Sequence, residues 1–97
     1  MTILSDALFL ASALVDECER NGIPVDRAHV NVYNTAFDGM RRATIFLDST
    51  EGQAIAERLR LPRAETFYHE GHAMRSAHRV VGRWVVDTTW PARGETR

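Results

Sequence analysis

The sequence predicts an α+β fold in which two helices lie on one face of a mostly antiparallel sheet of four to five strands. Two segments space their apolar residues as helices do, and five others read as strands, mostly with alternating apolar and polar residues. These elements follow one another in the order αββαβββ, with a short connection between the first two strands that favours a hairpin. Residues 1–91 are expected to form a single domain and residues 92–97 a flexible tail.

The first helix is expected over residues 2–20. Its apolar side chains form one broad stripe, Thr2 or Ser5 is placed to cap its start, and Asn21 and Gly22 end it. Phe9 is the exception, because it projects from the middle of the polar side. An aromatic side chain opposite the core stripe is a candidate for contact with a partner protein.

Residues 29–34 and 42–48 alternate at period two and are expected to pair as a hairpin. Val30 and Ile45 then point to the core, whereas Tyr33 and Phe46 point to the other face. An open sheet leaves that face uncovered and largely polar, so Tyr33 and Phe46 are further candidates for partner contact, including contact with a second copy of the chain.

The second helix is expected over residues 50–60, before Pro62. Thr50 and Gln53 have the spacing of a capping box. The apolar stripe is narrow and contains small residues, which let a helix lie close to a sheet. Gly52 is therefore interpreted as a packing glycine.

The last third predicts three strands in a meander, at residues 66–70, 74–81 and 83–90, with Pro91 ending the last one. Trp84 and Trp90 share a face of that strand.

Composition and charge exclude several classes of protein. Apolar residues make up 44% of the chain and charged residues 26%, as in a folded domain. Twelve basic and 13 acidic residues give a net charge of −1, which argues against a strongly basic nucleic-acid binder and a strongly acidic DNA mimic. No stretch approaches the roughly 20 apolar residues of a membrane helix, and the single cysteine, Cys18, excludes an internal disulfide. The protein is therefore expected in the cytoplasm and without a membrane partner.

Three sets of residues are candidates for chemistry. His69 and His72 flank a glycine turn, and His78 follows on the next strand, so the three imidazoles form a candidate metal site. This spacing differs from that of the metalloprotease helix motif, and exposed polar residues of a turn are the simpler interpretation. Cys18 lies on the apolar stripe, which favours a buried, unreactive thiol. No phosphate loop or dinucleotide motif occurs, so no cofactor and no catalytic residue are assigned.

The third set is basic. Arg75, Arg79 and Arg83 lie near aromatic residues, and the even spacing of Arg75 and Arg79 places them on one strand face. Guanidinium groups there could meet phosphates of a nucleic acid. Acidic residues in the same segment, such as Glu70 and Asp87, argue against this alternative.

The lysine-free composition, the helix Ser49 to Leu59 and the closing strand Gly82 to Val86 resemble small uncharacterised proteins of actinobacteria and their phages. The resemblance implies an accessory protein that binds a host component, and it carries no site residues. Residues 1–38 hold six acids and two arginines, and the remainder seven acids and ten arginines, a split that suits a charged partner. The leading hypothesis is a non-catalytic interaction module that binds another protein.

Overall fold

The computed structural model describes residues 2–36, 38–62 and 64–92 of the chain. The elements follow the predicted order. They are the helix α1 (Ile3–Arg20), the strands β1 (Arg27–Asn34) and β2 (Arg41–Asp48), the helix α2 (Gly52–Arg58), and the strands β3 (Glu65–His69), β4 (His72–Val81) and β5 (Trp84–Pro91).

The five strands form one sheet in the order β1-β2-β5-β4-β3. β1 and β2 form an antiparallel hairpin, and β3, β4 and β5 form an antiparallel meander. The two units join through β2 and β5, which run parallel to each other. The predicted α+β class is therefore confirmed, and the one parallel pair makes the sheet mixed.

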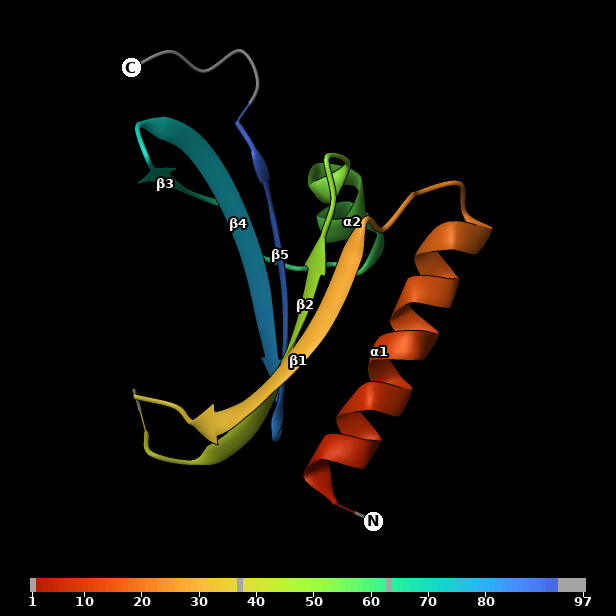
Figure 1. The fold of residues 1–97 in the computed structure, drawn as a ribbon, viewed down its shortest axis with the longest axis vertical. Coiled ribbons are helices and arrows are strands. Elements are labelled where there is room, and N and C mark those ends of the chain that lie inside the picture. Colours follow the sequence, from red (N-terminus) through yellow and green to blue (C-terminus); the bar gives the residue numbers. More distant parts are fainter. Residues whose placement is uncertain (1, 37, 63, 93–97) are drawn as a thin grey trace.

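Both helices lie on the same face of the sheet, as Figure 1 shows. α1 packs on β1 and β2, whereas the much shorter α2 packs on β5. Ala11 and Cys18 of α1 and Ile55 of α2 share one buried cluster with Ile45 and Leu47 of β2. The hairpin of β3 and β4 curls away from both helices (Figure 1). Among the described residues, no helix lies on the other face of the sheet, which we call the helix-free face.

Local signals fix the ends of α1 as predicted. The Thr2 side chain accepts a hydrogen bond from the Ser5 amide at 3.1 Å and caps the helix start. At the other end, the amide of Asn21 and that of Ile23 both donate to the carbonyl of Cys18.

The predicted capping box of α2 is wrong. The helix begins at Gly52, its N-cap residue is Glu51, and that residue makes no side-chain capping bond. The Thr50 amide instead donates to the Asp26 carboxylate at 3.1 Å, and Ser49 Oγ accepts from the Glu51 amide at 3.0 Å. Ser49 Oγ also donates to the Pro24 carbonyl at 2.7 Å. The bonds from Thr50 and Ser49 tie the segment before α2 to the segment before β1, so tertiary contacts decide where the helix starts.

Gly52 is a packing glycine, as predicted. A Cβ atom built on Gly52 would lie 2.6 Å from the Trp90 Cβ, closer than two carbons approach. Trp90 is buried under α2 together with Ala56, Leu61 and Ala77. The missing side chain therefore lets α2 lie directly on the indole ring.

We expect Gly52→Ala to destabilise the protein by about 1 to 3 kcal/mol, as overpacked core positions do. The gain in helix propensity is smaller, under about 1 kcal/mol. Urea unfolding measures the change. Gln53→Ala is the matched control at the next, exposed position, and we expect it to stay within about 0.5 kcal/mol of wild type. A Gly52→Ala protein as stable as this control would contradict the packing account.

β5 ends near the limit of the described chain. The Ala92 amide donates to the Ala73 carbonyl at 3.0 Å, so pairing with β4 continues one residue past Pro91. Of the tail expected over residues 92–97, residues 93–97 lie outside the described residues. Among the residues that the structure covers, no helix is long and apolar enough to span a membrane.

Candidate functional site

The helix-free face of the sheet carries two rows of side chains across β1, β2, β5 and β4. The strand register places His29, Phe46, Asp87 and His78 side by side in one row. The adjacent row consists of Asn31, Thr44, Val85 and Val80. This face was expected to be largely polar, but aromatic and aliphatic side chains make up much of its centre.

These rows border a shallow hollow of about 220 Å³. It is lined by Tyr33, Thr35, Thr44, Phe46, His78, Val80, Val85 and Asp87. Thr44 Oγ1 donates to Tyr33 Oη at 3.0 Å, which holds the phenol over β2. The His29 and Phe46 rings stack with centroids 4.6 Å apart, which restrains the phenyl ring. The walls of the hollow are thus held in place by specific contacts.

Asp87 is the half-buried carboxyl group of this hollow. Burial raises the pKa of Asp87 from 3.8 to about 6, although the positive charge of His78 opposes the shift. Within the described residues, Asp87 forms no ion pair, whereas Asp48 of the same face lies 3.1 Å from Arg27. The face therefore holds, close to neutral pH, a carboxylate that is partly desolvated and lacks a paired cation.

We expect Asp87→Asn to stabilise the free protein by about 1 to 2 kcal/mol at pH 8, a value reduced for partial solvent access. Asp87→Asn is stabilising because the pKa of Asp87 is raised in the folded protein. Between pH 3.8 and about 6, the folded state therefore binds more protons than the unfolded state. Wild-type stability therefore falls as the pH rises through that window. Urea unfolding at pH 8 and pH 4 measures the difference between the two proteins. It should nearly vanish at pH 4, and a difference that does not change with pH would contradict the assignment.

Arg42 lies at one end of this face and forms a hydrogen-bond network there. Its buried guanidinium donates to the Gly82 carbonyl at 3.0 Å and to Asp38 Oδ1 at 2.7 Å. It also donates to Thr35 Oγ1 at 2.7 Å. The bond from Arg42 and that from Thr35 hold the pKa of Asp38 well below its usual range. This network joins the connection between β1 and β2 to the turn between β4 and β5.

The structure separates the three residues predicted to contact a partner. Tyr33 and Phe46 lie together on the helix-free face and line the same hollow. Phe9, 79% exposed, lies on the outer side of α1, beyond the opposite face of the sheet. A shallow depression on α1 is lined by Phe9, Ser12, Ala13, Val15, Asp16 and Glu19. The prediction therefore joins two surfaces, of which the helix-free face brings two of the predicted aromatic rings to one hollow.

The structure does not bring the three candidate histidines together. His69 and His72 are cross-strand neighbours at the turn between β3 and β4. His78 lies six residues further along β4, which is about 20 Å at the rise of a strand. In the part of the chain that the structure covers, no three His, Cys, Asp or Glu side chains are placed to hold a metal ion. His78 instead belongs to the hollow that contains Asp87.

The three candidate arginines point to the helix side of the sheet or to its end. Arg75 and Arg79 pair with Trp90 and Val86, so they share a face as predicted. Arg75 donates to Thr66 and to the Ala64 carbonyl. Arg83 forms an ion pair with Asp6 of α1 at 3.2 Å and stacks over the Trp84 ring. Two of the three guanidiniums are thus engaged within the protein, and Trp90 is too buried to stack on a base.

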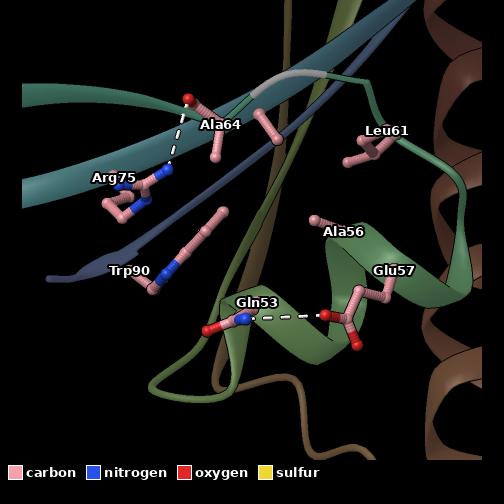
Figure 2. Close-up of a pocket in the computed structure, with 8 residues that line it drawn as sticks. Gln53, Ala56, Glu57, Leu61, Ala64, Arg75 and Trp90 are labelled. Carbon is pink, nitrogen blue, oxygen red and sulfur yellow. Dashed lines mark hydrogen bonds between the residues drawn. The ribbon is translucent and has the colours of Figure 1, made fainter. Parts of the chain in front are cut away.

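Figure 2 shows a second hollow, of about 400 Å³, on the helix side between α2 and β4. Arg75 and Trp90 border one side of it, and Gln53 and Glu57 of α2 border another. The polar groups bond within the protein, from Gln53 to Glu57 at 3.5 Å and from Arg75 to the Ala64 carbonyl at 3.4 Å. The polar groups of this hollow thus contact other groups of the same chain.

Cys18 is buried in the main core, as expected of an unreactive thiol, and burial raises the pKa of this thiol.

Asp87 and Val80 are residues of the helix-free face that the sequence did not identify as site residues. Alternation places Asp87 on the strand face opposite Trp84 and Trp90, but its cross-strand neighbours come from β2 and β4. Comparison with models of known protein families, with curated proteins and with solved structures found no match.

Proposed function

We propose that the chain is a non-catalytic module that binds another protein through the helix-free face of its sheet. One observation carries the proposal: no helix of the described chain covers this face, yet it presents a hollow framed by Tyr33, Phe46 and Val80. Apolar groups left in solvent at the centre of a sheet face are typical of a surface that becomes covered by a partner.

The resemblance to small proteins of actinobacteria and their phages supports an accessory role, in which the partner is a component of the host. The free Cys18 thiol fits a reducing compartment, so we propose that the protein acts in the cytoplasm. A second copy of the chain is a further possible occupant of the same face, and sedimentation of the purified protein reports it.

Two neighbouring valines provide a matched pair for the test. Val80 is 42% exposed on the helix-free face, and Val81 is 53% exposed on the opposite face of the same strand. Val80→Asn and Val81→Asn change polarity equally, without adding a charge, at adjacent positions. Each variant is attached to beads and incubated with an actinobacterial lysate, with and without nuclease, and bound proteins are quantified by mass spectrometry.

We expect wild type and Val81→Asn to retain a stoichiometric protein after nuclease treatment, and Val80→Asn to lose most of it. Equal capture by both valine variants, or no specific protein with any of them, would overturn the proposal. A component that disappears with nuclease from every sample would instead favour the arginine alternative, whose affinity falls steeply with salt.

A further inference from the structure

We propose that the hollow on the helix-free face receives a basic side chain, arginine or lysine, from the protein partner, with Asp87 as its counter-charge. This inference rests on the proposed function and adds to it the chemistry of the group that binds. The occupant is a protruding side chain because the hollow, at about 220 Å³, is smaller than the roughly 300 to 1,000 Å³ of pockets that enclose a whole small ligand.

The lining of the hollow suits a long side chain with a charged end. Phe46 and Tyr33 border it from β2 and β1, and Val80 and Val85 border it from β4 and β5. The methylene groups of arginine or lysine can pack on such apolar surfaces while the charged end reaches a carboxylate. Aromatic rings beside the same path add attraction for a cation. Asp87 lies among these groups, in the row between Phe46 and His78.

The charged groups of this face differ in whether they form ion pairs within the protein. Arg27 is paired with Asp48, and Arg42 donates to Asp38 and to the Gly82 carbonyl. Asp87 has no such ion pair among the described residues. The titratable groups that act on it are His78, which lowers the pKa of Asp87, and Asp48, which raises it. A half-buried carboxylate has lost part of its hydration. Hydrogen bonds from a guanidinium or ammonium group of a partner replace the lost hydration.

The test uses three peptide probes that differ at one side chain: Ac-Gly-Arg-Gly-amide, Ac-Gly-Lys-Gly-amide and the neutral Ac-Gly-norleucine-Gly-amide. Each is titrated into the ¹⁵N-labelled full chain at pH 8 and followed by NMR. We expect the two basic peptides to shift the amide signals of β2, β4 and β5 around Phe46, His78 and Asp87. The norleucine peptide should bind at least about tenfold more weakly, because the charged contact is lost.

Two carboxyl variants separate the hollow from general negative charge. Asp87→Asn should weaken binding of the basic peptides at least about tenfold. Glu65→Gln removes an exposed carboxyl group at the start of β3, on the same face, and should leave binding within about twofold. Asp87→Asn is expected to fold at least as well as wild type, so loss of binding cannot be ascribed to unfolding.

The affinity should also depend on pH. Protonation of Asp87 below about pH 6 removes the counter-charge, so binding at pH 5 should be about tenfold weaker than at pH 8. His78 and His29 are the other titratable groups of this row. Asp87→Asn should lack the part of the pH dependence that comes from the carboxyl group.

Equal binding of the norleucine and basic peptides, or unchanged binding by Asp87→Asn, would overturn this inference. Its failure differs from failure of the proposed function. If Asp87→Asn still captures the partner and Val80→Asn does not, the face binds a protein but not through a cation. If both variants capture it as wild type does, the face is not the binding surface.

Discussion

Arg42→Ala is expected to lower the melting temperature by roughly 10 to 20 °C, the largest loss of stability among the variants considered. The guanidinium is buried and has acceptors on two separate turns: Thr35 and Asp38 after β1, and the Gly82 carbonyl after β4. Alanine leaves a cavity and removes the donors from these acceptors at once. Circular dichroism during heating measures the change.

Arg41→Ala is the matched control, because Arg41 precedes Arg42 in β2 and is exposed. We expect its melting temperature to stay within about 3 °C of wild type, as for most surface changes. Equal melting temperatures of Arg42→Ala and Arg41→Ala would contradict the claim that the bonds of Arg42 stabilise the fold by joining the two turns. Loss of the network should also weaken partner capture, because Thr35 and Tyr33 line the hollow at this end of the face.

Phe46→Ala is expected to weaken binding of the captured protein by about 2 kcal/mol, or roughly 30-fold. Phe46 lies at the centre of the helix-free face, between His29 and Asp87 in its row. Aromatic groups at the centre of an interface carry a large share of binding energy, because the partner removes them from water. Surface plasmon resonance with the purified partner measures the dissociation constant.

Phe9→Ala removes an equally large ring from α1, where it is 79% exposed, and should change the affinity by less than about twofold. Tyr33→Phe keeps the ring and removes the hydroxyl group that accepts from Thr44. We expect an intermediate loss of about three- to tenfold from this variant, since the ring is held less firmly. A larger loss of affinity from Phe9→Ala than from Phe46→Ala would contradict this prediction and indicate that the partner binds α1.

The order and type of the elements could be predicted because each depends on neighbours in the sequence. Thr2 caps α1 and the Asn21-Gly22 pair ends it, and alternation assigned the faces of β1, β2 and β5. The predicted capping box of α2 was wrong because the Thr50 amide bonds to Asp26, which lies 24 residues earlier in the chain. A local pattern does not contain such contacts.

The candidate site could be predicted only in part, for the same reason. Tyr33 and Phe46 were identified because exposure of one hairpin face can be read from alternation. The surroundings of the Asp87 carboxyl group are set by its two cross-strand neighbours, Phe46 and His78. Phe46 becomes a neighbour only through the parallel pairing of β2 with β5. The sequence left strand order open, so it gave no reason to place this carboxyl group beside these rings. Phe9 was selected for exposure, which does not distinguish an isolated ring from a shared surface.

Photo-crosslinking tests most directly the central claim that the helix-free face is the binding surface. Benzoylphenylalanine replaces Tyr33 in one variant and Phe9 in another, so that aromatic positions on opposite sides of the molecule carry the same reactive group. Each variant is irradiated with the captured partner, and the covalent product is quantified by mass spectrometry. We expect a covalent product from position 33 and little from position 9. A product mainly from position 9 would contradict the account and assign binding to α1.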